Sequence, residues 1–164
     1  MLLRDLESRD LDGVLALNES EVPRVSSLDR ARLVALVALS EQALVVDVDD
    51  RLGAFVLTLA PGAAYDSVNY GYFQTRGGRF LYVDRIVVAE HARRRGVASH
   101  LYDAIGAHAT RYGFDEVTCE VNVRPPNAPS SAFHAARGFV GVGEQETAGG
   151  SVRVELLALP VTGV

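Results

Sequence analysis

The chain has 164 residues, a formal net charge of −5 and 48% hydrophobic residues, which is enough apolar material to bury a core. This composition excludes an intrinsically disordered chain, and the negative charge argues against a general nucleic-acid binder, which needs a basic surface. The one cysteine, Cys119, cannot form an internal disulfide, and we expect it to be a small buried residue of a strand.

The N-terminus carries no pattern typical of a secretory signal, because Arg4 and Asp5 follow the first three residues at once. The apolar runs are shorter than the roughly 20 residues of a membrane-spanning helix. We therefore expect a single domain over residues 1–164 in the cytoplasm, with neither a membrane nor a nucleic acid as its partner.

The chain is predicted to begin with a short edge strand followed by two helices. Residues 1–5 are typical of the strand, and Asp10 is expected to cap a helix that runs to about Glu19. Ser26 or Ser27 is expected to cap the second helix, whose leucines recur at helical spacing.

A hairpin and a long loop are predicted next. Residues 43–48 and 52–59 are typical of strands, and Asp49-Asp50 of the turn between them. Residues 60–79 are rich in glycine and aromatic side chains but show no clear period. We expect a loop there, and a loop of this length in a compact domain is often functional.

The second half of the chain predicts a strand–helix–strand unit. Residues 81–88 form an apolar run interrupted by Asp84-Arg85, which is typical of a central strand buried on both faces. A helical pattern follows from Val97 to about Gly113, and residues 116–123 are typical of the next strand. The two strands of such a unit are expected to lie parallel.

The C-terminal part predicts a short helix and a closing hairpin. The helix follows Pro125-Pro126-Asn127 and ends at Gly138, a typical C-cap residue. Residues 139–142 and 152–159 are expected to pair around Gly149-Gly150.

The arginine turn, residues 93–96, carries the strongest chemical signal. Arg93-Arg94-Arg95-Gly96 stands between the central strand and a helix. Backbone N–H groups at a helix start have no intrahelical partner, and arginines beside them donate charge-assisted hydrogen bonds to phosphate. The turn therefore predicts a site for a small anionic, phosphorylated ligand.

Two motifs in this region resemble the signatures of the GNAT superfamily of acetyl-CoA-dependent N-acetyltransferases. Arg93-x-x-Gly96-x-Ala98 resembles the first, (Gln/Arg)-x-x-Gly-x-(Gly/Ala), and the segment from Asn127 to Phe139 resembles the second, Asn-x-x-Ala-x-x-(Leu/Phe)-Tyr-x-x-x-Gly-Phe. The resemblance covers almost the whole chain. It implies an α/β fold with a mixed, mostly antiparallel sheet of about six or seven strands, about four flanking helices and a splayed parallel strand pair.

The resemblance implies acetyl-CoA as the cofactor and a set of residues that hold it. The splaying is expected to begin at a bulge near Asp84 or Arg85, which would leave the backbone of the central strand for the pantetheine arm. The turn and the following helix start would hold the pyrophosphate. The cofactor residues so implied are Ile86, Val87, Val88, Arg93, Arg94, Arg95, Gly96, Val97, Ala98, Ser99, Asn127, Ser130 and Phe133. Asn127 is open to two readings, a cofactor contact and a plain N-cap.

Acetyl transfer to an amine requires removal of an ammonium proton, and the leaving thiolate benefits from a proton donor. In the superfamily that donor is usually a tyrosine of the second signature, but here the position holds His134. His134 is the candidate general acid, with Tyr82 and Tyr102 as weaker substitutes. Asp84 is the first candidate base, or alternatively the partner of an ion pair with Arg85. Glu120 is the reserve base.

The acceptor pocket is expected from residues 18–25, between the first two helices, and from residues 65–70 of the long loop. The acceptor-binding candidates are Tyr65, Asp66, Asn69, Tyr82 and Asn122. The expected acceptor is a primary amine on a small metabolite, an amino acid or a protein N-terminus.

Two alternatives to a catalytic acetyltransferase compete with this prediction. A non-catalytic module that binds or senses acyl-CoA would explain the missing tyrosine. A P-loop nucleotide-binding protein is less favoured, because the chain has no Gly-x-x-x-x-Gly-Lys-(Ser/Thr) motif. No metal is expected, since His100 and His108 lie eight residues apart on one helix. The resemblance also implies that a homodimer can form through the last strands.

Overall fold

The computed structural model describes residues 1–161 of the chain. Its strands are β1 (Leu2–Asp5), β2 (Gln42–Val48), β3 (Arg51–Leu59), β4 (Phe80–Val88), β5 (Glu116–Arg124), β6 (Val140–Thr147) and β7 (Val152–Pro160). Its α-helices are α1 (Leu11–Ser20), α2 (Arg30–Leu39), α3 (Val68–Arg76), α4 (Val97–Tyr112) and α5 (Ala128–Ala136). Short 3₁₀ turns lie at Ser8–Asp10, Glu90–Ala92 and Ala148–Gly150. None of the described helices combines the length and the hydrophobicity that a membrane-spanning segment requires.

The strands form a seven-stranded mixed sheet in the order β1-β2-β3-β4-β5-β7-β6. β4 and β5 are parallel and pair from Phe80–Glu116 to Tyr82–Thr118. The β1–β2, β2–β3, β5–β7 and β6–β7 pairs are antiparallel. The predicted mixed sheet and its parallel strand pair are confirmed, while the bulge near Asp84 stays a prediction.

The chain divides into two compact units that interleave along the sequence. The first contains residues 1–60 and 83–107, and the second contains residues 61–82 and the chain from 108 onward. Both β4 and α4 contribute to each unit. The expectation of a single domain over residues 1–164 stays a prediction.

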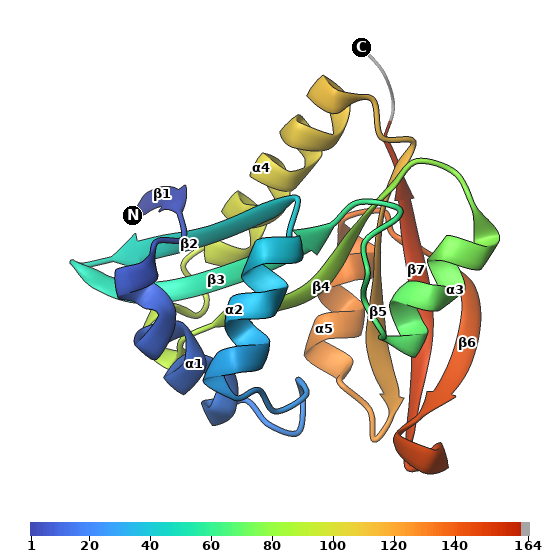
Figure 1. Cartoon of the computed structure of the whole chain (residues 1–164), viewed down its shortest axis with the longest axis horizontal. Helices are drawn as coiled ribbons and strands as arrows, with labels where there is room; N and C mark the ends of the chain where they lie inside the picture. Colours follow the sequence, from blue (N-terminus) through green and yellow to red (C-terminus); the bar gives the residue numbers. More distant parts are fainter. Residues whose placement is uncertain (162–164) are drawn as a thin grey trace. The chain divides into compact units, whose positions relative to one another are not determined.

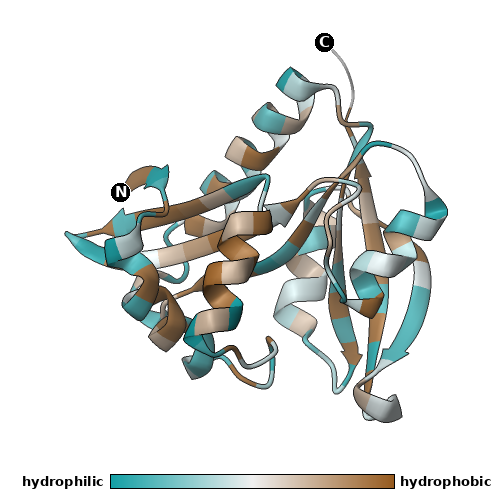
Figure 2. Ribbon diagram, viewed as in Figure 1, coloured by the Kyte–Doolittle hydropathy of each residue, from teal (hydrophilic) through white to brown (hydrophobic). Residues whose placement is uncertain are grey.

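In the first unit, α1 and α2 lie in front of the β2–β3 hairpin (Figure 1). Figure 2 shows that hydrophobic residues predominate along these two strands. Val14 of α1, Leu33 of α2 and Phe55 of β3 are all fully buried. Burial of such side chains supplies the main favourable term for folding, about 1.5–3 kcal/mol each.

In the second unit, an aromatic cluster joins α3 to the beginning of β4. The Tyr70 ring lies 5.8 Å from Phe80 and 5.6 Å from Tyr82, and Phe73 lies 5.8 Å from Tyr82. All four side chains are essentially inaccessible to solvent. Edge-to-face contacts of this kind stabilise a core beyond the area that they bury.

Helix α3 occupies residues that the sequence predicts to be loop, so that prediction is wrong. The helix begins after Ser67, whose hydroxyl accepts a hydrogen bond from the Tyr70 amide, and it ends at Gly77 with φ +81°. Only Tyr70 and Phe73 of this helix are buried. One buried pair gives too short a period to be recognised as helical.

The N-cap predicted for α2 is also wrong. The cap is Asp29, whose carboxylate accepts a hydrogen bond from the Arg32 amide at 2.7 Å. Ser27 instead donates its hydroxyl hydrogen bond to Glu19. Asp10 precedes α1 as predicted, but its carboxylate binds Arg4 rather than the helix start. The side chains of Ser27 and Asp10 therefore bind other side chains instead of the helix starts.

Candidate functional site

The arginine turn leads from the 3₁₀ turn after β4 into α4. Arg94 and Gly96 adopt positive φ angles of 60° and 78°. Gly96 is exposed, and a Cβ atom added to it would meet nothing within 4 Å. Glycine is therefore required here by the backbone conformation and not by lack of space. Because α4 begins at Val97, its first N–H groups have no partner within the helix.

Two arginines of the turn are held by carboxylates of the same unit. Arg93 donates from Nε to the Val88 carbonyl at 3.2 Å and forms an ion pair with Glu21. Arg95 binds Asp49 of the β2–β3 turn at 2.6 Å and holds the pKa of that carboxyl below its usual range. Positive charge is thus concentrated at the start of α4, with acidic side chains beside it.

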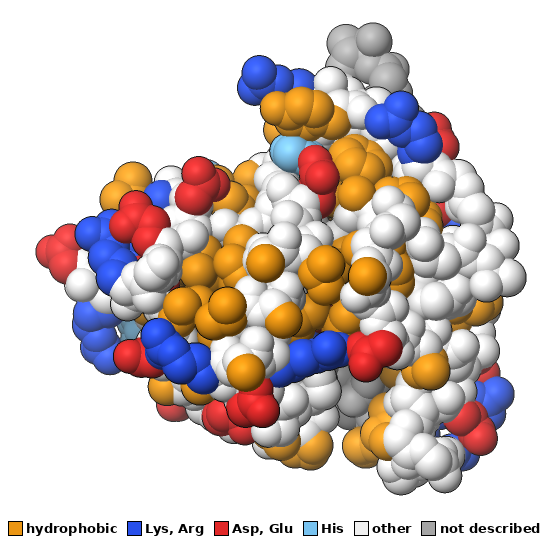
Figure 3. Space-filling view, in the orientation of Figure 1, with side chains coloured by type: hydrophobic (Ala, Val, Ile, Leu, Met, Phe, Trp, Pro, Cys, Tyr) orange, Lys and Arg blue, Asp and Glu red, His pale blue; other side chains and the backbone are white. Residues whose placement is uncertain are grey.

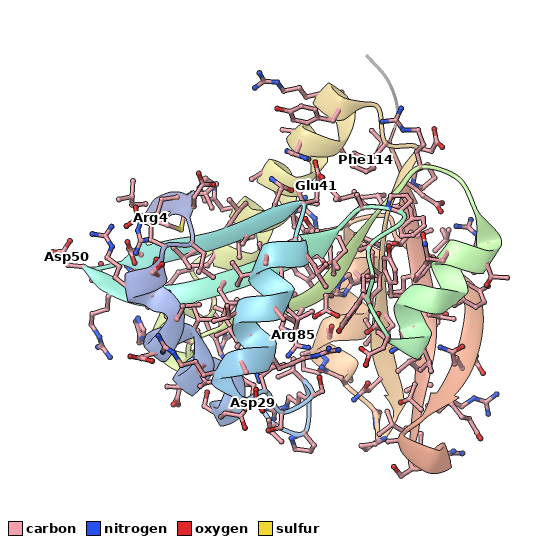
Figure 4. All side chains as sticks on the ribbon, viewed as in Figure 1. Arg4, Asp29, Glu41, Asp50, Arg85 and Phe114 are labelled. Atoms are coloured by element: carbon pink, nitrogen blue, oxygen red, sulfur yellow. The ribbon has the colours of Figure 1, made fainter. Side chains whose placement is uncertain are left out.

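Asp84 and Arg85 interrupt the apolar β4 strand as a buried ion pair. Arg85 Nε donates to Asp84 at 2.7 Å, and the two side chains are only 4% and 3% exposed. The guanidinium also binds the Asn18 side chain at 3.0 Å and both the carbonyl and the hydroxyl of Ser26. Figure 4 labels Arg85 on β4 and Asp29 at the start of α2. The ion pair that was one alternative for Asp84 is thus present, and its role as a base stays a prediction.

Alternate residues of β4 are partly exposed near its carboxyl end. Asp84 as a residue is partly exposed although its side chain is not, so its exposed surface belongs to the main chain. Ile86 and Val88 are also partly exposed, whereas Val87 between them is buried. An accessible strand backbone offers N–H and C=O groups to an extended ligand.

Glu120 and Tyr82 form a polar pair where the parallel pairing of β4 and β5 ends. The Tyr82 hydroxyl donates to Glu120 Oε2 at 2.8 Å. Tyr82 is completely buried, and Glu120 is partly exposed. Thr118, the β5 partner of Tyr82, is buried, and its hydroxyl has no hydrogen-bond partner among the described residues.

His134 lies on α5 and contacts two aromatic rings. The centroid of its ring is 5.4 Å from that of Phe133 and 5.1 Å from that of Phe139. Its Nδ1 atom is 2.8 Å from the Ser130 carbonyl oxygen. Since a carbonyl only accepts, Nδ1 carries the hydrogen and the neutral ring has its lone pair on Nε2. Burial lowers the pKa of His134, and the charge of Arg137 adds to this, against the opposing effect of the Ser130 bond. The neutral ring is therefore favoured.

The other residues of the second signature form the beginning of α5. Asn127 is its N-cap and accepts a hydrogen bond from the Ser130 amide at 3.4 Å, which is the capping role open to it from the sequence. Phe133 is partly exposed, and Arg137 lies over its ring at 5.9 Å. Asn122 is partly exposed, and its carbonyl accepts from the Asn127 amide at 2.9 Å.

The candidate acceptor residues of the segment before β4 are placed differently from one another. Tyr65 is partly exposed and lies 5.7 Å from the buried Tyr70 ring, and Asp66 is exposed. Asn69 is on α3, where its side chain accepts a hydrogen bond from Gln145 of β6 at 2.8 Å. Asn69 thus helps to fasten α3 to β6.

Several residues of the site region were missed by sequence reasoning. Glu19 accepts hydrogen bonds from the Leu28 amide, Ser27 and Asn18, which together lower its pKa. Tyr72 donates to the Val142 carbonyl at 2.7 Å. The sequence offered one signal for these contacts, the polar Asn18 within the apolar face of α1. Within residues 1–161 no group of three or more His, Cys, Asp or Glu side chains is placed to bind a metal.

Comparison with known proteins agrees with this architecture. The model of the acetyltransferase (GNAT) family matches residues 17–139, which is more than half of the chain. No curated protein matches the sequence significantly.

Solved structures show the same fold at low sequence identity. The ribosomal-protein-S18-alanine N-acetyltransferase of Escherichia coli is 15% identical, with a TM-score of 0.75 over 99% of this chain and 95% of that one. Ard1 of Thermoplasma volcanium is 18% identical, with a TM-score of 0.76 over 98% and 97%. Arabidopsis thaliana NAA60, solved with a bisubstrate analogue, is 16% identical, with a TM-score of 0.76 over 99% of each chain. With the family model matching three-quarters of its length, the chain belongs to the GNAT acetyltransferase family and is an acyltransferase enzyme.

Proposed function

We propose that this protein is an acetyl-CoA-dependent N-acetyltransferase that acts on a primary amine by direct attack within a ternary complex. The observation that carries the proposal is the exposed start of α4 behind Gly96, with three arginines ahead of it. Unpaired N–H groups, the helix dipole and guanidinium groups together favour a pyrophosphate over any neutral ligand.

The residues present fit acetyl-CoA. The backbone of residues 94–99 would bind its phosphates, and the open space around Gly96 leaves room for them. The main chain of the partly exposed residues Asp84, Ile86 and Val88 would bind the pantetheine arm. When bound, acetyl-CoA supplies the thioester whose acetyl group is transferred. A donor for the thioester oxygen is then expected among the strand amides near Val88.

We assign the removal of the ammonium proton to Glu120. It is partly exposed, and the Tyr82 hydroxyl orients its carboxylate from the buried side. Asp84 is less suited, because its carboxylate is buried and bound to Arg85. A carboxylate base must reach the proton that it accepts, and a buried carboxylate held by a guanidinium group cannot do so without breaking that contact.

His134 is less suited to the general-acid role than its position in the motif suggests. A proton donor to a thiolate must carry its hydrogen on the atom that faces the thiolate. The hydrogen of neutral His134 is on Nδ1 and is bound to Ser130, and burial disfavours the protonated ring. We therefore propose that His134 orders the beginning of α5 through Ser130.

The acceptor remains a primary amine of a small metabolite, an amino acid or a protein N-terminus. Tyr65 and Asp66 are proposed to contact it, since an aromatic face and a carboxylate both attract an ammonium group. The Escherichia coli structure with this fold is an enzyme for a protein alanine, which favours including peptides among the test substrates. The buried Cys119 is compatible with the proposed cytoplasmic location.

The proposal is tested by thiol release from acetyl-CoA in the presence of small amines, amino acids and peptides with a free N-terminus. Direct attack predicts acceptor-dependent thiol release. When both substrates are varied, the lines of the double-reciprocal plots of initial rate are expected to intersect. Parallel plots would contradict the ternary complex. Binding of acetyl-CoA without release for any acceptor would favour the non-catalytic acyl-CoA module.

A further inference from the structure

Arg93 connects the arginine turn to the segment that follows α1. Its guanidinium binds the Val88 carbonyl at the end of β4 and the carboxylate of Glu21, the residue that ends α1. The second oxygen of Glu21 is bound by Arg24 at 3.1 Å. One guanidinium group thus separates the Glu21 carboxylate from the end of β4.

Glu21 differs from the other carboxylates around the turn. Its side chain is 17% exposed, whereas Asp49, the partner of Arg95, is 68% exposed. Figure 3 shows arginine and acidic side chains beside one another at several places on this face of the molecule. An exposed ion pair such as that of Asp49 and Arg95 is therefore not unusual for this surface. A largely buried carboxylate loses much of its hydration and requires a cation as partner.

Arg93 has two anions that compete for it once the arginine turn binds a pyrophosphate. In the structure its side chain is held by Glu21. A pyrophosphate carries more charge than a carboxylate and would lie at the same turn. Movement of Arg93 toward the phosphates would leave Glu21 with Arg24 as its described cation, and Arg24 is 65% exposed.

We propose that Glu21 binds the ammonium group of the acceptor, and that Arg93 holds Glu21 until acetyl-CoA binds. This inference rests on the proposed function, because it takes the arginine turn as the pyrophosphate site. The acetyl group is expected near Val88, and Arg93 bridges Val88 to Glu21. The carboxylate is therefore close to the place where the amine must attack. Acceptors are then cationic amines rather than hydroxyl compounds.

The exchange of partners makes the two substrates cooperative. Acetyl-CoA must displace Glu21 from Arg93, so the ion pair lowers the affinity for acetyl-CoA. By linkage, bound acetyl-CoA raises the affinity of Glu21 for an amine by the same factor. An ion pair of this exposure contributes a modest free energy, which corresponds to about a two- to fivefold change in affinity.

The test is calorimetric titration of the wild type, Glu21→Gln and Glu90→Gln with coenzyme A. Glu21→Gln removes the competitor for Arg93 and is expected to tighten coenzyme A binding about two- to fivefold. Glu90→Gln removes the same charge from an exposed residue near the turn, and none of the described ion pairs involves its side chain. Its effect is expected to be smaller than twofold.

Hydrogen exchange of the wild type gives a second readout that needs no variant. Loss of the Arg93 tether is expected to speed exchange of the Arg24 and Val25 amides, which are bonded to the Glu21 carbonyl, when coenzyme A is added. Unchanged affinity in Glu21→Gln, or equal tightening in both variants, would overturn the inference, as would slower exchange. If the wild type does not bind coenzyme A at all, both the proposed function and the inference about Glu21 fail.

Discussion

Tyr82, which pairs with Thr118 at the end of the parallel β4–β5 ladder, donates its hydroxyl hydrogen bond to Glu120 at 2.8 Å. The tyrosine is completely buried and the carboxylate is partly exposed. A buried donor thus orients a carboxylate that is partly exposed. This hydrogen bond is the basis on which we propose Glu120 as the general base.

Glu120→Gln is expected to lower kcat about 10²- to 10⁴-fold, because a general base contributes a factor of this size. The affinity for acetyl-CoA is expected to stay within about twofold, as Glu120 lies outside the residues proposed to hold it. Initial rates of thiol release and calorimetric titration together give both quantities.

Asp84→Asn is the control for this assignment, since it removes a carboxylate that is already paired with Arg85. If kcat falls in Asp84→Asn with an altered pH–rate profile but not in Glu120→Gln, then Asp84 is the base and the assignment is wrong.

Arg85→Met is expected to lower the free energy of unfolding by about 3–5 kcal/mol, because it leaves the buried Asp84 carboxylate without its cation. Ser26→Ala removes one hydroxyl bond to the same guanidinium and should cost about 1 kcal/mol. Urea unfolding measures both. The double variant Asp84→Leu, Arg85→Met should recover most of the loss, and a double variant as unstable as Arg85→Met would contradict the ion-pair account.

Gly143 of β6 is expected to tolerate no side chain, because an added Cβ would lie 2.5 Å from the Tyr72 hydroxyl and 2.9 Å from its ring. Tyr72 is held by its bond to the Val142 carbonyl, so Gly143→Ala should cost about 1–3 kcal/mol by overpacking.

Gly141 on the same strand is the matched control for Gly143. Its added Cβ would meet only the carboxylate end of Glu155, which can rotate away. Gly141→Ala should therefore change stability by less than about 0.5 kcal/mol. Thermal unfolding measures the stability of both variants. Equal losses of stability would contradict a close contact between Tyr72 of α3 and Gly143.

The stability of the protein is expected to fall as the pH drops below 6.5, the ordinary pKa of histidine. Burial lowers the pKa of His134 in the folded state, so the unfolded chain binds a proton there first. His134→Asn, whose side-chain amide can still donate to Ser130, should remove this dependence between pH 6.5 and the lowered folded-state value. Thermal midpoints measured against pH test it.

Carboxylates give a separate effect at lower pH. Glu19 has its pKa lowered from an ordinary value of 4.5 by the Leu28 amide and two side chains, so its contribution to stability is lost only below that pH.

In the His134→Asn variant kcat is expected to stay within about twofold of the wild-type value. A large loss of kcat would restore His134 as the general acid.

Much of the fold could be predicted from local patterns. The apolar run of β4, the turn at Gly96 and the period of α4 identify a strand–helix–strand unit, and the parallel pairing follows from its connection. Helix α3 was missed because it buries only Tyr70 and Phe73, yet Ser67 and Gly77 mark its two ends. Cap residues therefore held information that hydrophobic periodicity did not.

The site was less predictable, because its polar contacts join residues far apart in the sequence. Arg85 binds Asn18 and Ser26, and no local pattern relates positions so distant. The same applies to Glu21 and Arg93. The cofactor residues named from the motif positions stay a prediction, and only the tertiary structure shows which carboxylate is already paired.

The most direct test of the account is calorimetric titration with acetyl-CoA of the wild type, Gly96→Glu and Gly113→Glu. Both glycines have positive φ and open surroundings, at opposite ends of α4, so each substitution places a side chain in a left-handed backbone conformation without a steric clash. The account predicts saturable binding by the wild type and Gly113→Glu, and at least about tenfold weaker binding by Gly96→Glu, whose carboxylate repels the phosphates. Equal binding by all three proteins, or none by the wild type, would contradict the arginine turn as the acetyl-CoA site.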